Sequence, residues 1–269
     1  MHTDTDDTLI AFDIQGLALP AGGQDGVVDS EGARIWYASF GNGAPVMLLH
    51  GGMGNAGNMA KQVPALIAAG FRAIVIDSRG QGRSSWDGRP YSYELMAADV
   101  FAVMDQLGIA KAAVVGWSDG ACIGLVMAKA RPERVAGLFY FACNVDPSGT
   151  WPFEMTEEIG HCISRHQKDY AALSPTPDGF QAMADALQVM QREQPNYSAA
   201  DLASVAVPVA VAQAERDEFI RPEHARYIAE TIPGARYVEL PGVSHFAPVQ
   251  RPALFNAAIL AFLQPLPPF

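Results

Sequence analysis

A serine flanked by glycines is the residue of this chain with the clearest chemical potential. The sequence Gly116-Trp117-Ser118-Asp119-Gly120 follows a strand-like run at 111–115 and precedes a helix-like run at 121–130. A G-x-S-x-G sequence in this context is typical of a nucleophile elbow, a sharp turn that presents the serine Oγ. Larger residues two positions to either side would collide across such a turn. The pattern therefore predicts that Ser118 is a nucleophile.

A serine hydroxyl is a weak nucleophile at neutral pH, so it needs a base within reach and an acid that orients this base. Of the six histidines, His245 is the candidate base, because it follows the last predicted strand. This places it at the same edge of the sheet as Ser118. The loop after the preceding strand carries two candidate acids, Glu215 and Asp217.

The elements that must position these residues alternate between strands and helices. Strands are predicted at 34–38, 45–50, 71–77, 112–115, 135–141, 208–212 and 235–240. Apolar residues recur at helical spacing over 93–107, and Pro222 and Pro252 each open a helix-like run. This series predicts an α/β fold with a mostly parallel, doubly wound sheet and helices on both faces. Ligands of such sheets bind at the carboxyl ends of the strands.

Changes in composition predict three segments. Residues 1–25 are polar and are expected to be a loosely ordered N-terminal extension, whereas 26–145 and 204–269 form the α/β core. Residues 146–203 contain prolines, helical patches and no clear strand. We expect them to form a helical cap that shapes specificity through bulky residues; the alternative is ordinary helical packing on the sheet. These bulky residues are Trp151, Phe153, Met183 and Met190.

Five motifs in order give the chain a resemblance to α/β-hydrolase fold enzymes over about residues 26–263. They are His50-Gly51-Gly52-Met53, Asp77-Ser78-Arg79-Gly80-Gln81-Gly82-Arg83-Ser84, the elbow, Glu215-Arg216-Asp217 and Gly242-Val243-Ser244-His245. The resemblance implies the chain order nucleophile, acid, base, and so favours Asp217 as the acid.

The same resemblance implies further roles. The N–H groups of Gly52 and Asp119 would form an oxyanion hole, with Met53 as the alternative to Gly52. His50 and Arg79 would be scaffold residues. Met53, Trp117 and Trp151 are expected to contact the substrate.

A serine hydrolase of small carboxylic esters or related acyl compounds is the leading interpretation, with an acyl-Ser118 intermediate. It would need no cofactor and no metal. Two alternatives stay open: hydrolysis of C–C bonds or lactones by the same triad, and a ligand receptor on this fold. The haloalkane dehalogenase branch of the fold uses aspartate at the elbow, so Ser118 disfavours it.

The residue after the nucleophile has its own alternatives. The sequence Trp117-Ser118-Asp119-Gly120 is similar to the elbow of the valacyclovir hydrolase branch, and this similarity implies that the Asp119 carboxylate receives a substrate amino group. Two simpler roles are open: Asp119 stabilises the first helical turn, or it pairs with an arginine.

Bulk composition limits the partners. The formal net charge of -11 argues against nucleic acid or an anionic membrane as a partner. The expected partner is the small acyl substrate of the serine hydrolase interpretation. No apolar run of the sequence approaches membrane-spanning length. The acidic residues 1–7 lack the features of a signal peptide, so none is expected. The three cysteines, an odd number without metal-type spacing, favour a reducing cytoplasm. The sequence leaves the oligomeric state open, and a homo-oligomer is compatible with it.

Overall fold

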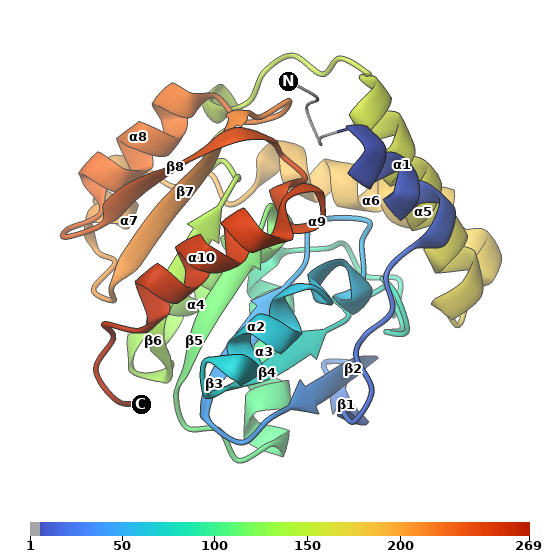
Figure 1. Cartoon of the computed structure of the whole chain (residues 1–269), viewed down its shortest axis with the longest axis horizontal. Coiled ribbons are helices and arrows are strands. Elements are labelled where there is room, and N and C mark those ends of the chain that lie inside the picture. Colours follow the sequence, from blue (N-terminus) through green and yellow to red (C-terminus); the bar gives the residue numbers. More distant parts are fainter. Residues whose placement is uncertain (1–5) are drawn as a thin grey trace.

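One sheet organises the residues that the computed structural model describes, 6–269 (Figure 1). It has eight strands in the order β1-β2-β4-β3-β5-β6-β7-β8. The strands are β1 (Gln24–Ser30), β2 (Ala33–Phe40), β3 (Ala44–Leu49), β4 (Phe71–Ile76), β5 (Ala112–Trp117), β6 (Val135–Phe141), β7 (Val209–Arg216) and β8 (Arg236–Ser244). Strands β3 to β8 run parallel, and β1 and β2 extend the sheet in antiparallel fashion.

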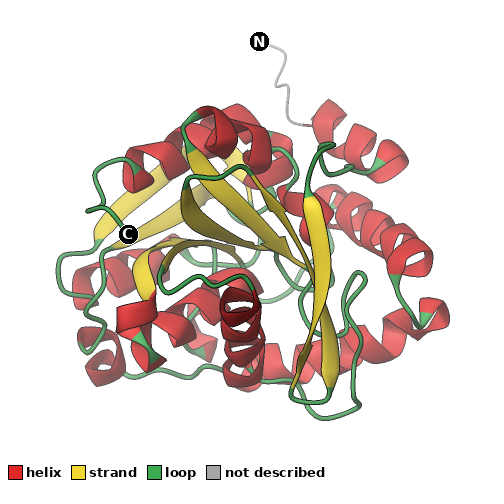
Figure 2. Ribbon diagram, turned by 90° about the horizontal axis from the view of Figure 1, so that it is seen from below, coloured by secondary structure: helices red, strands yellow, loops and turns green. Residues whose placement is uncertain are grey.

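The central strands are buried on both faces, as their continuous apolar sequences predict. Every residue of β5 and β6 is buried. Successive side chains of β3 alternate between two apolar layers: Val46 and Leu48 enter one, and Met47 and Leu49 the other. The sheet is therefore sandwiched between two helical layers, which confirms the predicted α/β fold class (Figure 2).

Helices from different parts of the chain form the two layers. The layer that receives Met47 and Leu49 contains α3 (Tyr93–Gln106), α4 (Asp119–Ala130) and α8 (Pro222–Thr231). The opposite layer contains α2 (Gln62–Ala68), α9 (Ala247–Gln250) and α10 (Pro252–Leu263).

Between β6 and β7 the chain forms three α-helices instead of a single crossover helix: α5 (Glu157–Leu173), α6 (Phe180–Glu193) and α7 (Ala199–Ala203). Residues 146–203, all of them described, contain no strand beyond an isolated bridge from Thr150 to Ile220. Helices α5 and α6 pack against each other. Each also sends apolar side chains into the core, such as Cys162 from α5 and Leu187 from α6.

The N-terminal region corrects one expectation. Residues 6–15 form helix α1 (Asp6–Gln15), which packs on α5 and α9 (Figure 1). The side chains of Leu9 and Phe12 are buried, and the Asp13 carboxylate pairs with Lys168 on α5. The prediction of loose order over 1–25 is therefore wrong for 6–15 and for 24–25, which begin β1, and its part over 1–5 lies outside the described residues. Short polar helices gain stability from tertiary packing, which composition does not report.

No helix within residues 6–269 combines the length and the apolar character that crossing a bilayer requires.

Candidate active site

The turn around Ser118 has the geometry that its sequence predicts. Ser118 stands between β5 and α4 with φ 54° and ψ -123°, a backbone conformation that is rare for a residue with a side chain. A Cβ on Gly116 would lie 2.3 Å from the Gly120 carbonyl oxygen, and one on Gly120 would lie 2.2 Å from the Leu49 carbonyl oxygen. Both positions therefore require glycine, and the strained turn leaves Ser118 partly exposed.

Strand register brings the other candidate residues to the same edge of the sheet. Residues Arg216 of β7 and Ser244 of β8 are register partners. Asp217 and His245 are the next residues of the two strands, so they leave the sheet side by side. Strand β6 pairs in parallel with both β5 and β7, so the carboxyl ends of these strands lie at the same edge of the sheet. Ser118 follows the carboxyl end of β5 and therefore lies at that edge as well.

Asp217 contacts the imidazole of His245 and Glu215 does not. His245 Nδ1 lies 3.0 and 3.2 Å from the two carboxylate oxygens of Asp217. Asp217 Oδ1 also accepts the backbone N–H groups of Phe219 and Ile220 at 3.0 and 2.9 Å, which fixes the carboxylate. Glu215 is exposed and accepts the N–H of Gly242 at 2.6 Å.

A second carboxylate beside His245 was missed by the sequence reasoning. Glu218 Oε2 accepts the backbone N–H of His245 at 2.9 Å. Burial raises the pKa of Glu218. A second titratable group therefore lies against the candidate base. Burial alone would lower the pKa of His245, but the charges of Asp217, Glu218 and Asp119 outweigh it, and the net pKa is raised. The only signal in the sequence was that Glu218 is adjacent to Asp217.

Aromatic rings enclose the imidazole of His245. Its ring centroid lies 4.6 Å from that of Phe219, 5.6 Å from Phe246 and 6.1 Å from Trp117. Among the described residues, no hydrogen bond joins Ser118 Oγ to His245. Catalytic hydrogen bonds are often long before substrate binds, so the two side chains share an edge of the sheet without yet being paired.

The loop after β3 lies against the start of α4. A Cβ on Gly51 would lie 3.2 Å from Ser118 Cβ, and one on Gly52 would lie 2.5 Å from Asp119 Oδ2. Met53 has a φ of 63° and is partly exposed. Asp119 is the first residue of α4, where backbone N–H groups have no partner within the helix. This loop and the start of α4 are the two segments predicted to supply amides to the oxyanion that would form on an acyl group attached to Ser118.

The Asp119 side chain is 4% exposed and makes two hydrogen bonds. Oδ1 accepts the Tyr93 hydroxyl at 2.8 Å, and Oδ2 accepts Nε2 of Gln191 at 2.9 Å. Its partners are therefore a tyrosine and a glutamine rather than an arginine. Burial raises the pKa of Asp119, and the two donors oppose this rise. Tyr93 and Gln191 were not predicted as site residues, because each is far from the elbow in sequence.

The two tryptophans expected to contact substrate lie in different settings. Trp117 is 3% exposed, with a buried Nε1 that has no hydrogen-bond partner among the described residues. The structure thus places its ring in the core beneath His245. Trp151 is 40% exposed and lies under the guanidinium of Arg221, 4.4 Å from the ring centroid. Its backbone N–H bonds to the Phe219 carbonyl oxygen at 2.8 Å.

His50 serves as a fixed link beneath the loop after β3. Its Nδ1 lies 2.7 Å from the Gly51 carbonyl oxygen, which requires an N–H at Nδ1. Nε2 then accepts the Ser78 N–H at 3.0 Å. Burial lowers the pKa of His50, in keeping with this neutral form.

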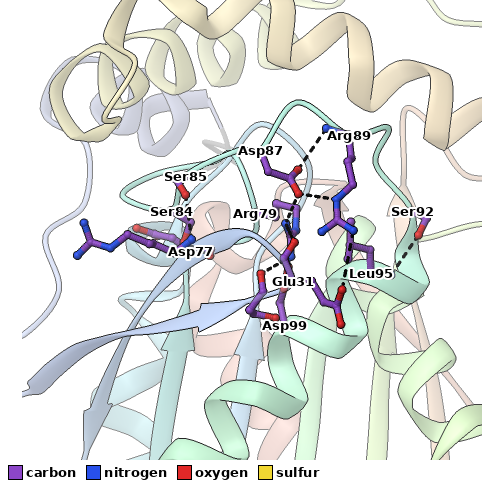
Figure 3. Close-up of polar contacts among 12 residues, drawn as sticks. Glu31, Asp77, Arg79, Ser84, Ser85, Asp87, Arg89, Ser92, Leu95 and Asp99 are labelled. Carbon is purple, nitrogen blue, oxygen red and sulfur yellow. Dashed lines mark hydrogen bonds and ion pairs between the residues drawn. The ribbon is translucent and has the colours of Figure 1, made fainter.

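Arg79 lies in a buried polar network outside the elbow. It is fully buried and donates two hydrogen bonds to Asp99, at 3.0 and 2.6 Å. Asp87 lies on its other side, 3.4 Å away, and Figure 3 shows Arg79 between these two carboxylates near Glu31. The network ties the loop after β4 to α3 and to the end of β1, as expected of a scaffold residue.

Within residues 6–269, no group of three or more His, Cys, Asp and Glu side chains could hold a metal ion. Cys122 and Cys143 are buried with their Sγ atoms 2.8 Å apart, and Cys162 is buried in α5.

Comparison with known proteins agrees with this geometry. Residues 44–155 match the family described as alpha/beta hydrolase fold. The protein named "Putative carbamate hydrolase RutD" of Azorhizobium caulinodans is 30% identical over 252 residues, covering 86% of this chain and 95% of its own. Rhodomycin D methylesterase DnrP of Streptomyces peucetius is 29% identical over 294 residues, covering 87% and 96%.

Solved structures extend the likeness to three dimensions. Est816, described as an N-acyl homoserine lactone degrading enzyme, is 26% identical with a TM-score of 0.69, covering 88% of this chain and 100% of its own. The enol-lactonase of Burkholderia xenovorans LB400 has a TM-score of 0.69 at 24% identity, with 89% and 100% covered; at that identity the likeness concerns the fold.

Proposed function

Because this chain belongs to the α/β-hydrolase family and is a hydrolase, we propose that it cleaves a small carboxylic ester or related acyl compound through an acyl-Ser118 intermediate. The observation that supports this most directly is the meeting of Ser118, Asp217 and His245 at one edge of the sheet. A carboxylate on Nδ1 orients the imidazole, so that Nε2 can take the serine proton.

The proposed reaction has two steps. Ser118 Oγ attacks the acyl carbonyl carbon while its proton passes to His245 Nε2. The N–H groups of Gly52 and Asp119 stabilise the oxyanion, and Asp217 stabilises the imidazolium. The imidazolium then protonates the leaving alcohol. Water, deprotonated by His245, hydrolyses the acyl-serine and restores the enzyme.

We also propose that residues 146–203 form a cap that takes part in substrate selection. Its support is the direct bond from Gln191 of α6 to Asp119, together with the position of the loop before α5. Within that loop Phe153 stacks on Phe219, with centroids 6.4 Å apart, and Phe219 in turn contacts His245.

Lactone opening is the second candidate reaction, favoured by the likeness to Est816, whose title names lactone degradation. A lactone is an internal ester, so the same residues would act in the same order, with the leaving alcohol remaining attached to the acyl group.

Labelling and turnover together test the proposal. A fluorophosphonate should modify the protein at Ser118 alone, and Ser118→Ala should lower p-nitrophenyl acetate and butyrate turnover by several orders of magnitude. Ser204→Ala is the matched control, because Ser204 is exposed at the end of α7. A label mapped elsewhere, or turnover that survives Ser118→Ala, would overturn the mechanism. Turnover of a panel of esters, lactones and compounds with a hydrolysable C–C bond then shows which reaction the protein catalyses best.

A further inference from the structure

Gln191 on α6 donates a hydrogen bond to Asp119 and lies beside the backbone of Gly52. We infer that it is a positioning residue for the oxyanion hole that these two residues are proposed to form. The inference rests on the proposed function, because it concerns how the backbone amides of Gly52 and Asp119 are held. It assigns to α6 a part in the chemical step as well as in covering the site.

The first observation is a three-way contact. Gln191 Nε2 donates to Asp119 Oδ2 at 2.9 Å. A Cβ built on Gly52 would lie 2.6 Å from that same Nε2 and 2.5 Å from Asp119 Oδ2. The amide and the carboxylate therefore fill the space beside the backbone of residue 52, where a side chain would not fit. The hydrogen bond between Gln191 and Asp119 therefore lies beside both segments that are proposed to supply the oxyanion donors.

The second observation is a second link from the same end of α6. Gln194 Oε1 accepts the backbone N–H of Tyr93 at 3.2 Å, and the Tyr93 hydroxyl bonds to Asp119 Oδ1 at 2.8 Å. Met190 and Leu187 are buried in the core next to these links. The C-terminal end of α6 is therefore anchored by apolar packing, and it reaches Asp119 both directly and through Tyr93.

Because Asp119 is buried, its hydrogen bond with Gln191 matters for the state of the carboxylate. A buried carboxylate is stable as an anion only when donors satisfy its oxygens. Without Gln191, Oδ2 would be unpaired, and the side chain would rotate or take up a proton. Either change moves the first residue of α4, whose backbone N–H is proposed to bind the oxyanion. The titratable groups that influence Asp119 or lie near it are Tyr93 of α3, His245 after β8 and the thiols of Cys122 and Cys143.

Leucine at position 191 removes the donor and keeps similar bulk. Gln191→Leu should lower kcat and kcat/KM together by at least about tenfold, because the lost interaction acts in the transition state. Gln188→Leu is the matched control: it makes the same substitution on the exposed side of the same helix and should leave both constants unchanged. Thermal unfolding of each variant shows whether the fold persists.

Gln191→Glu should change kcat/KM in a pH-dependent way, which a purely structural contact would not do. When the introduced carboxylate and Asp119 are both charged, they repel each other. As the pH falls the pair takes up one shared proton, which restores a donor to Oδ2. The ratio of variant to wild-type kcat/KM should therefore rise several-fold as the pH falls.

A ratio that stays constant with pH, together with Gln191→Leu that matches Gln188→Leu, would overturn the inference. The proposed function fails separately, if wild-type turnover does not depend on Ser118. A folded Gln191→Leu variant in which only KM rises would place Gln191 in substrate binding and would also contradict the positioning role.

Discussion

His245 meets two carboxylates, and the contacts of each define its role at the scale of single residues. Asp217 faces Nδ1 of the imidazole, so its role is to stabilise the orientation and the positive charge of the ring. Glu218 accepts the backbone N–H and so holds the start of the segment that carries the ring. Burial on its own would lower the pKa of His245, but Asp217, Glu218 and the more distant Asp119 together raise it. A base with a raised pKa takes the serine proton more readily.

Exchange of the two candidate acids for their amides separates their roles. Asp217→Asn should lower kcat by about 10⁴, because the imidazole then loses its orienting anion and takes the wrong tautomer. Glu215→Gln should change kcat little, because Glu215 is exposed and its one hydrogen bond within residues 6–269 is to the Gly242 N–H. Steady-state kinetics with p-nitrophenyl butyrate measures both. The reverse ranking would move the acid to Glu215 and would contradict the observed contact.

At the scale of elements, the segment between β6 and β7 combines two kinds of apolar residue. Met183 and Met190 are 0% and 1% exposed and belong to the core. Phe153 is 63% exposed and stacks on Phe219, which contacts the imidazole of His245. The four bulky residues predicted to shape specificity therefore divide, and the buried methionines serve packing first.

This division predicts opposite effects of truncation. Phe153→Ala should change the ratio of kcat/KM between acetate and butyrate esters and leave the thermal midpoint nearly unchanged. Met190→Ala should cost about 2–5 kcal/mol of stability, because it opens a cavity in the core. Thermal unfolding and kinetics on the two esters measure both quantities. Unchanged selectivity in Phe153→Ala would place this loop outside the substrate path.

The sequence was sufficient for elements with strong local signals. The buried strands, the elbow and the helices that start at Pro222 and Pro252 follow from apolar runs, glycine pairs and proline positions. Helix α1 could not be predicted, because it depends on burying Leu9 and Phe12 against distant elements.

The same limit applies to contacts within the site. Gln191 reaches Asp119 across 72 positions of the chain, and no local pattern encodes that contact. The sequence does indicate which residues follow the strands at the edge of the sheet where Ser118 lies. It does not define which side chains from elsewhere complete their hydrogen bonds.

For the whole molecule, buried histidines couple folding to pH. Burial lowers the pKa of His50, His166 and His224, and that of His166 falls to about 3 from an ordinary value of 6.5. For His166, the positive charge of Arg165 lowers the pKa further. Above pH 6.5 the imidazole is neutral in both the folded and the unfolded chain. Below it, the unfolded chain binds a proton that the folded chain excludes, so stability falls as the pH falls toward the folded pKa. His245 acts in the opposite direction, because its pKa is raised.

His166 offers a way to measure this coupling in isolation. Its Nε2 is buried without a hydrogen-bond partner among the described residues, and Phe12 packs edge-on to its ring at 6.4 Å. His166→Phe removes the proton-binding group and keeps an aromatic ring. Relative to wild type, the variant should gain about 2 kcal/mol of unfolding free energy between about pH 7.5 and about pH 5, at roughly 1.4 kcal/mol per pH unit below 6.5. Because the other ionisable groups are common to both proteins, their contributions cancel in the difference. Urea titrations at the two pH values give that difference. If it does not change with pH, His166 titrates alike in the folded and unfolded chains, and its burial contributes nothing to acid sensitivity.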